Sequence, residues 1–257
     1  MSGAMTRRLG ATLLAVAVLV GTGWAEAAEI RVLSAGAVRA IVTELAQTFE
    51  KESGHKVSMA FGTAGVTRQR LASEPADVVI LTDVGIDATI KEGGIAAGTR
   101  TDIGRSGIGV GVRDGAPRPD ISTSDALKRA LLATPSITYV DPAQGATSGI
   151  YFASLLQTFG IADAMKAKTT LVPGGYPAEL VAKGEVAMVV HQISEIVPVK
   201  GVALVGPLPK EVQKVTVYSA GIATKATSPD AARAFVAFLT SPAMKPKFAA
   251  AGLDYKE

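Results

Sequence analysis

The residue types between positions 141 and 149 suit the binding of an anion. This loop reads DPAQGATSG and separates an apolar, strand-like stretch from a periodic apolar segment at 150–159. A small-residue turn ahead of a helix leaves backbone N–H groups unpaired, and these groups and the helix dipole favour negative charge. Thr147 or Ser148 stands where the N-cap of this helix is expected. For this loop taken alone, an ordinary capped helix is the simpler interpretation.

Two further loops, residues 34–37 and 62–66, repeat the arrangement nearer the N-terminus. Each comes at the expected carboxyl end of a strand, where open α/β sheets bind their ligands. Three loops of one kind favour a binding site over three unrelated turns. The residues that we assign to the ligand from these loops are Ala35, Gly36, Thr63, Ala64, Gly65, Thr147, Ser148 and Gly149.

Longer side chains could complete such a site. Arg39 and Arg68 each follow a loop within one helical turn, and a guanidinium group there would suit a carboxylate ligand. Each of them could instead face solvent on an amphipathic helix. His191 follows the apolar stretch 185–190 and could donate to an anion or move a proton, or it could be a hydrogen-bonded histidine at a strand end. Three more residues, for which a plain loop, turn or strand end is the alternative, are Ser106, Tyr176 and Gln192.

Several chemistries have no support in the residues. There is no cysteine, no serine lies in a Gly-x-Ser-x-Gly turn, and no histidine pair has the spacing of metal ligands. The glycines at 107, 109 and 111 lack the dinucleotide-binding spacing. A net charge of +3 with dispersed Lys and Arg, and 5% aromatic residues, argues against a nucleic-acid partner. We therefore predict no metal, no cofactor and no nucleic acid.

The first 27 residues have the pattern of an export signal. Arg7 and Arg8 precede an apolar run at 9–20, and Ala25-Glu26-Ala27 fits a small-x-small cleavage site. The apolar run is shorter than the ~18 residues of a membrane span, which favours a removed signal over a retained anchor. Without cysteine the mature chain carries neither a lipid anchor on that residue nor a disulfide. We predict a soluble periplasmic monomer.

The order of apolar and periodic segments predicts an α/β fold. Strand-like stretches at 30–33, 57–61 and 77–81 alternate with helical patterns, which indicates a parallel sheet with right-handed crossovers. Apolar stretches at 108–112 and 215–222 are expected to run between two lobes, each a mainly parallel sheet flanked by helices, with two hinge crossings. A single continuous sheet is the alternative. The predicted division places residues 28–108 and 218–257 in lobe 1 and residues 109–217 in lobe 2.

This order of segments resembles the periplasmic solute-binding proteins of the molybdate-binding type (type II) over nearly the whole mature chain. The segments that carry the resemblance are residues 29–37, FGTAG at 61–65, PADVVI at 75–80, DP at 141–142 with SGIY at 148–151, and AFVAFLTSP at 234–242. The resemblance implies a two-lobed protein that holds a tetrahedral oxyanion between its lobes. In this family hydroxyls and backbone N–H groups hold the anion, without a cationic side chain.

The resemblance also implies ligand positions, and some of them are altered. The family's first-loop serine falls at Gly36, which lacks the hydroxyl, whereas the second-loop serine falls near Thr63 or Ala64. The third-loop N–H donor falls at Ser148 and the fourth near Tyr176. The changed ligand shell makes us expect a carboxylate or another oxyanion in place of a strict molybdate site.

The end of the second lobe resembles a subgroup of these proteins whose ligands are mostly undefined, and the periplasmic aconitate isomerases resemble this subgroup in scaffold. The residues that carry this resemblance are QISE at 192–195 and VGPLP at 205–209, and Val190-His191-Gln192 stands where molybdate binders have a tyrosine. The main hypothesis is a binding protein that delivers a small anion to the permease of an ABC importer. The alternative is an isomerase that shifts a proton within an unsaturated tricarboxylate such as aconitate, with His191 as its base. A protein that signals to a membrane receptor is a third possibility.

Overall fold

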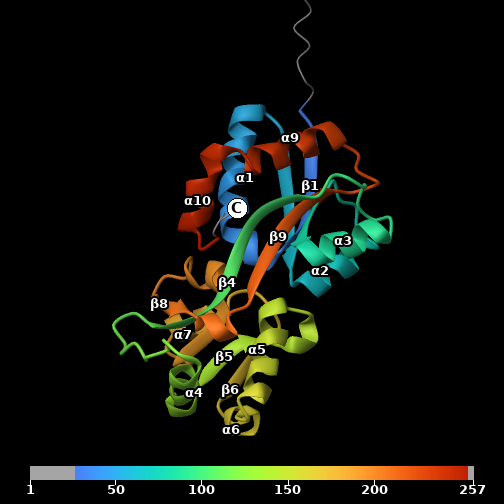
Figure 1. Ribbon diagram of the computed structural model, residues 1–257. Helices are drawn as coiled ribbons and strands as arrows, with labels where there is room; N and C mark the ends of the chain where they lie inside the picture. The colour runs from blue at the N-terminus through green and yellow to red at the C-terminus, as the bar shows by residue number, and fades with distance from the viewer. Residues whose placement is uncertain (1–26, 254–257) are drawn as a thin grey trace, which may run out of the picture.

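The computed structural model describes residues 27–253 (Figure 1). The predicted signal sequence lies outside the described residues, apart from Ala27 at its end. The strands are β1 (Glu29–Ala35), β2 (Lys56–Gly62), β3 (Val78–Thr82), β4 (Thr101–Arg113), β5 (Ile137–Val140), β6 (Thr169–Val172), β7 (Met188–Gln192), β8 (Val202–Pro207) and β9 (Val215–Ile222). The helices are α1 (Arg39–Ser53), α2 (Ala64–Leu71), α3 (Asp83–Lys91), α4 (Ser124–Ala133), α5 (Thr147–Thr158), α6 (Ala162–Lys166), α7 (Ala178–Ala182), α8 (Ile193–Ile196), α9 (Pro229–Leu239) and α10 (Lys245–Ala250). Short 3-10 turns are η1 (Gly36–Val38), η2 (Pro142–Gln144), η3 (Lys210–Val212) and η4 (Pro242–Met244).

The strands follow one another in the order β2-β1-β3-β9-β4-β7-β5-β6, and β8 pairs with β4. At one end β1 is parallel to both β2 and β3, and at the other end β5 is parallel to both β6 and β7. The two long strands between these groups, β9 and β4, pair antiparallel with each other and with their neighbours. The predicted α/β class with parallel strands in each lobe is therefore correct, with antiparallel strands added in the middle.

Strand β4 joins the two lobes. Its residues 101–107 pair with β9, whereas residues 108–113 pair with β7 and β8. In Figure 1, β4 and β9 run from the half that carries α1, α2, α3, α9 and α10 toward the half that carries α4 to α7. The lobe boundaries at residues 108 and 218 stay a prediction, supported by this change of pairing partners.

Each lobe has its own apolar core. In lobe 1, the apolar face of α1 packs with Val32 of β1, Ile80 of β3 and Phe235 of α9. In lobe 2, Phe152 of α5 packs with Leu127 of α4 and with strands β5 and β7. These faces follow the 3.6-residue period of a helix and the continuous apolar pattern of buried parallel strands. Two separate cores allow the loops between them to form a cleft.

Two local predictions from the sequence were wrong. Neither Thr147 nor Ser148 is the N-cap of α5: Ala146 takes that position, and no side chain caps the helix. Strand β7 runs through Gln192, so His191 and Gln192 belong to the strand instead of following it. Both residues are buried, and their tertiary partners, described below, account for these differences.

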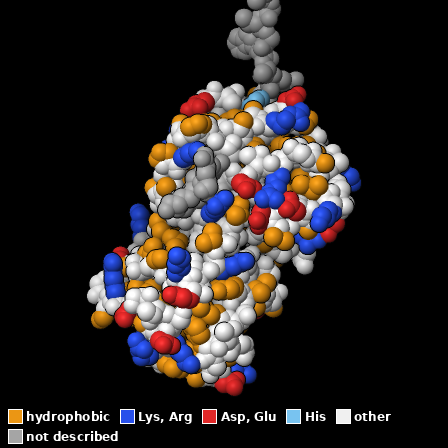
Figure 2. All heavy atoms as spheres, viewed as in Figure 1, with side chains coloured by type: hydrophobic (Ala, Val, Ile, Leu, Met, Phe, Trp, Pro, Cys, Tyr) orange, Lys and Arg blue, Asp and Glu red, His pale blue; other side chains and the backbone are white. Residues whose placement is uncertain are grey.

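The surface in view carries charged side chains of both signs (Figure 2). On the face shown in Figure 2, Lys and Arg side chains alternate with Asp and Glu, and no basic stripe forms. Within residues 27–253, no helix combines the length and the apolarity of a membrane span.

Candidate functional site

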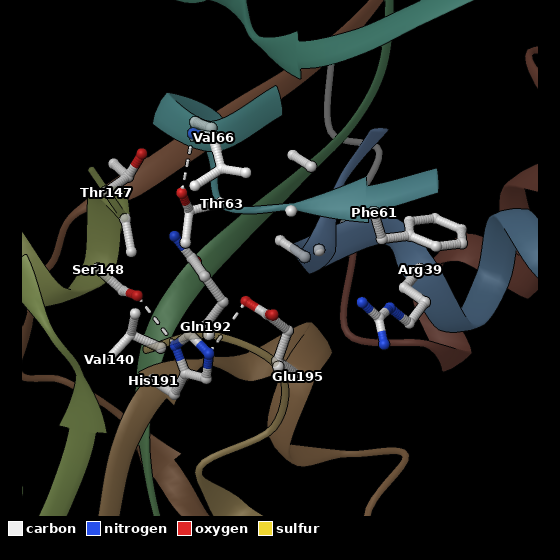
Figure 3. Close-up of a pocket in the computed structure, with 18 of the residues that line it drawn as sticks. Arg39, Phe61, Thr63, Val66, Val140, Thr147, Ser148, His191, Gln192 and Glu195 are labelled. Carbon is white, nitrogen blue, oxygen red and sulfur yellow. Dashed lines mark hydrogen bonds and ion pairs between the residues drawn. The ribbon is translucent and has the colours of Figure 1, made fainter. Parts of the chain in front are cut away.

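A cavity of about 210 Å³ lies between the two lobes at the ends of β1, β2, β5 and β7 (Figure 3). Lobe 1 contributes the loop after β1, the end of β2 and the start of α2. Lobe 2 contributes the start of α5, the turn after β6, and the end of β7 with α8. The lining residues are Ala35, Gly36, Ala37, Arg39, Phe61, Gly62, Thr63, Ala64, Val66, Val140, Ala146, Thr147, Ser148, Pro173, Gly174, Gly175, His191, Gln192, Glu195 and Tyr218.

The N-terminal ends of α2 and α5 meet this cavity from opposite lobes. Thr63 caps α2, because its Oγ1 accepts a hydrogen bond from the N–H of Val66 at 3.1 Å. The start of α5 has no side-chain cap, so its first N–H groups have no partner within the helix. Both ends carry the positive pole of a helix dipole. The cavity therefore suits a negatively charged ligand.

The start of α2 also contacts the turn ahead of α5 across the cleft. The Thr63 hydroxyl donates to the carbonyl oxygen of Gln144, and the N–H of Gly65 donates to the carbonyl oxygen of Gly145 at 3.4 Å. Gly149 brings α5 close to β5, since a Cβ at this position would lie 2.1 Å from the carbonyl oxygen of Val140. These contacts explain why small residues occupy both loops.

A chain of three polar side chains forms the lobe 2 wall of the cavity. Ser148 Oγ lies 2.9 Å from His191 Nδ1, and His191 Nε2 lies 3.2 Å from Glu195 Oε2. His191 is 2% exposed and Glu195 is 7% exposed. The contact between His191 and Glu195 has the distance of an ion pair but not the alignment of a hydrogen bond, so Nε2 has no hydrogen-bond partner among residues 27–253. A buried and incompletely paired imidazole in a cavity is a candidate for ligand contact or proton transfer.

Arg39 provides the cationic group at the cavity. Its guanidinium carbon lies 4.9 Å from the ring centre of Phe61 and 5.7 Å from that of Tyr176. These rings come from different lobes, so Arg39 contacts both lobes. Burial raises the pKa of the Tyr176 phenol, as does the Glu195 charge, whereas Arg39 acts in the opposite direction.

A second tyrosine, Tyr218, lines the same cavity as Glu195. Tyr218 of β9 is 3% exposed, and burial, followed by the charge of Glu195, raises the pKa of its phenol well above the ordinary value. Its hydroxyl is 3.3 Å from the side-chain oxygen of Gln192 once that amide is oriented to satisfy both of its ends. The same amide group then donates to the carbonyl oxygens of Ser106 and Gly107. Gln192 thus ties β7 to β4 and β9 at the point where the lobes meet.

Most of the predicted site residues do line the cavity. The residues that the structure brings together there are Ala35, Gly36, Arg39, Thr63, Ala64, Thr147, Ser148, His191 and Gln192. Tyr176 lies near the wall through its contact with Arg39.

Four predicted residues lie away from the wall. Gly65 and Gly149 serve the packing described above, and Ser106 donates to the carbonyl oxygen of Gly252 and accepts from the N–H of Ser194. Arg68 forms an ion pair with Glu92 on the surface. Arg68 is therefore positioned for solvent, which was its alternative interpretation.

The sequence-based prediction missed Glu195, Phe61 and Tyr218. Glu195 stands four residues after His191, in α8, which begins directly after β7. A histidine and a glutamate at this spacing are a weak signal that could have been noticed. Among the described residues, no group of three or more His, Cys, Asp or Glu side chains could hold a metal ion.

Comparison with known proteins agrees with this geometry. Residues 30–254 match the family model described as bacterial extracellular solute-binding protein. The chain is 36% identical over 243 residues to an aconitate isomerase from a Pseudomonas species, covering 92% of this chain and 90% of that protein. It is 39% identical over 94 residues to the molybdate-binding protein ModA of Azotobacter vinelandii, covering 36% of this chain and 34% of that protein.

Solved structures share the fold at low identity. The periplasmic molybdate-binding protein of Azotobacter vinelandii superposes with a TM-score of 0.74 at 18% identity, covering 89% of this chain and all of that chain. The sulfate-binding protein SubI of Mycobacterium tuberculosis superposes with a TM-score of 0.65 at 17% identity, covering 88% of this chain and 86% of that chain. The matched fold, the cavity between two lobes and the family model over residues 30–254 lead to one conclusion: the chain belongs to the bacterial extracellular solute-binding proteins.

Proposed function

We propose that this protein captures a small anion in the cavity between its lobes. The observation that carries the proposal is the convergence of the N-terminal ends of α2 and α5 on one cavity from opposite lobes. The first N–H groups of α5 have no side-chain cap and can donate hydrogen bonds to an anion, and both helix starts carry the positive pole of a dipole, so no metal is needed. Closure of the lobes strengthens those hydrogen bonds, because it excludes water from the site.

The ligand class that we favour is a small carboxylate, with an inorganic oxyanion as the other option. Arg39 supplies a guanidinium group, which pairs well with a carboxylate, and Gly36 lacks the hydroxyl that a molybdate binder of this type uses. The predicted export signal places the mature chain in the periplasm. There it acts as a monomer and delivers the anion to the permease of an ABC importer.

A thermal-shift screen of the mature protein, residues 28–257, tests the proposal. The panel contains molybdate, tungstate, sulfate, phosphate, citrate and both isomers of aconitate. A ligand that binds only the folded state raises the melting temperature by mass action, by an amount that grows with concentration. We expect at least one tricarboxylate to raise it. If no anion in the panel shifts the transition at millimolar concentration, the proposed function is wrong.

A second function is favoured by the buried contact of Ser148, His191 and Glu195. An isomerase of an unsaturated tricarboxylate moves one proton. A base removes the proton from a CH₂ group beside a carboxylate, and the double bond shifts toward that carbon. A proton is then added to the former alkene carbon. Atoms and electrons balance without a cofactor. His191 is the base that we propose, through Nδ1, because this atom lies at the cavity beside the Ser148 hydroxyl and the Glu195 carboxylate next to Nε2 stabilises the protonated ring. The aconitate isomerase relative, 36% identical, supports this reading.

Incubation with one aconitate isomer separates the two functions. Proton NMR would follow the appearance of the other isomer, with His191→Gln as the test variant and Arg68→Gln as the control. Turnover that His191→Gln abolishes and Arg68→Gln preserves supports the isomerase. Binding without turnover leaves the transport function, and turnover that survives His191→Gln removes His191 as the base.

A further inference from the structure

The carboxylate of Glu195 lies beside the position where Gly36 has no side chain. A Cβ built on Gly36 would be 3.1 Å from Glu195 Oε1, closer than such contacts usually come. Glu195 thus uses the space that the glycine leaves, and the two residues come from different lobes. Both line the cavity in which we place the ligand.

The Glu195 carboxylate has one oxygen that is free to accept a hydrogen bond from a ligand. At least one of His191 Nε2 and Glu195 Oε2 carries a hydrogen, because two bare acceptors would repel each other at 3.2 Å, although the contact is not aligned as a hydrogen bond. That hydrogen belongs to the imidazole when Glu195 is ionised. The second oxygen, Oε1, then has no hydrogen-bond donor among the described residues (Figure 3). An ionised carboxylate accepts hydrogen bonds and donates none.

We propose that Glu195 is a specificity-determining residue. It selects anions that place a hydrogen against its Oε1 atom. The hydrogen is an O–H, as in a hydroxy acid, or an acidic C–H, as in the CH₂ group of an unsaturated tricarboxylate. Anions whose whole surface consists of lone pairs, such as molybdate, tungstate and sulfate, bind more weakly. This inference rests on the proposed capture of an anion in the same cavity.

The reason for the weaker binding is electrostatic. A lone-pair oxygen placed against Oε1 repels it, and the low dielectric of a closed cleft strengthens that repulsion. A ligand O–H turns the same contact into a charge-assisted hydrogen bond. A CH₂ group brings neither a charge nor a lone pair to the contact, so Oε1 does not repel it. Sites that reject a competitor through an unpaired polar group discriminate far better than those that rely on size alone.

Isothermal titration calorimetry at mildly alkaline pH tests the proposal, since molybdate and sulfate carry no proton there. The oxyanion arm uses molybdate and sulfate. The O–H arm uses citrate, and the C–H arm uses the two aconitate isomers. The proteins are the mature wild type, Glu195→Gln, Glu195→Ala and the control Glu92→Gln, whose side chain pairs with Arg68 outside the cavity. Circular dichroism confirms that each variant is folded.

We expect the wild type to bind citrate or aconitate at least about tenfold more tightly than molybdate or sulfate. Glu195→Gln should lower the ratio of tricarboxylate affinity to oxyanion affinity by about tenfold or more, because the amide N–H can donate to an oxyanion. Glu195→Ala should lower this ratio less, since it removes the repulsion without adding a donor, and it serves if the glutamine variant does not fold. Glu92→Gln should keep the wild-type preference.

Two results would overturn the inference and leave the proposed function standing. One is wild-type protein that binds molybdate or sulfate as tightly as the tricarboxylates. The other is a Glu195→Gln variant that changes all affinities by the same factor. If neither class of anion binds the wild type, the proposed function fails, and this inference fails with it. A preference for citrate alone identifies the O–H source, and one for aconitate alone identifies the C–H source.

Discussion

Two buried carboxylates in this protein have opposite surroundings. Asp77, ahead of β3 in lobe 1, is fully buried and accepts hydrogen bonds from the backbone N–H of Arg31 at 2.9 Å, its Nε at 3.1 Å, and the N–H of Thr227 at 2.6 Å. It also accepts from the Thr227 hydroxyl and the N–H of Ser228. Glu195, at the cleft, has a single unaligned contact with His191. Both carboxylate oxygens of Asp77 accept hydrogen bonds, whereas Oε1 of Glu195 has no donor among the described residues.

The difference separates a structural carboxylate from a functional one. Asp77 ties β1 to the start of α9 within lobe 1, and no ligand is needed to complete its contacts. Glu195 lies between lobes, where a permanent set of donors would fill the space that a ligand needs. A folded protein keeps few buried polar groups unsatisfied, and His191 Nε2, which contacts Glu195, is one of two such side-chain atoms among the described residues.

The largest expected effect is on stability at Asp77. Asp77→Asn removes the charge from a buried network and leaves Arg31 and the N–H groups of Thr227 and Ser228 poorly paired. We expect the free energy of unfolding to fall by about 3 kcal/mol, in the range measured for a broken buried pair. Urea unfolding followed by circular dichroism measures it, with Glu74→Gln of the surface pair with Arg70 as the control. An unchanged unfolding midpoint would show that the network adds no stability.

The contribution of Asp77 to the free energy of unfolding should depend on pH in the acid range. Burial disfavours the charged form of Asp77, but the hydrogen bonds from Arg31, Ser228 and Thr227 outweigh this, and the pKa falls from 3.8 to about 2. A lowered pKa stabilises the folded state above the ordinary pKa, and that contribution is lost as the pH falls from 3.8 toward 2. The loss amounts to about 2 kcal/mol. Urea unfolding across this window should show the difference between wild type and Asp77→Asn shrinking as the pH falls, and a constant difference would contradict the assignment.

Much of the fold could be predicted from the sequence because it depends on local patterns. The predicted strand at 215–222 has those bounds in the structure, and the apolar period of Ile41, Leu45 and Phe49 does mark the buried face of α1. The start of α5 could not be predicted in the same way. Ser148 has the residue type of an N-cap, but its hydroxyl pairs with His191 from a strand more than 40 positions away, and that partner is invisible in a local window.

The sequence predicted which loops line the cavity, but it did not predict which charged side chains lie there. Loops of small residues after strands mark the cavity correctly, since backbone groups at helix starts need no particular partner. Arg39 and Arg68 look equivalent in the sequence, yet one lies at the cavity and the other pairs with Glu92. Glu195 was missed because its meaning depends on the empty space at Gly36, which comes from the other lobe.

The two arginines test whether the cavity, as opposed to charge in general, holds the ligand. Arg39→Ala should weaken binding of whichever anion gives the largest thermal shift by about tenfold, because a charge-assisted contact at the site is lost. Arg68→Ala removes the same charge from the surface and should leave affinity unchanged, since an exposed ion pair contributes little. Titration calorimetry of both variants at equal ionic strength measures the effect. Equal losses from the two substitutions would indicate attraction by net charge alone.

The smallest expected effect concerns the stability of the ligand-free protein when Glu195 is changed. Glu195→Gln removes an attraction to His191, but it also removes the cost of holding an ionised carboxylate away from water, and the two changes oppose each other. We expect the free energy of unfolding to change by less than about 1 kcal/mol, whereas Asp77→Asn costs several times more.

Urea unfolding of the two variants, without any anion and at the same pH, makes this a direct comparison of one carboxylate with the other. A loss at Glu195 as large as that at Asp77 would mean that the contact with His191 is itself a structural pair, and that the open side of Glu195 is not kept for a ligand. A small or favourable change would fit a group whose partner arrives only on binding. In that case the free energy of unfolding of the wild type should rise when the protein is saturated with its anion. A ligand that binds only the folded state adds its binding free energy to folding.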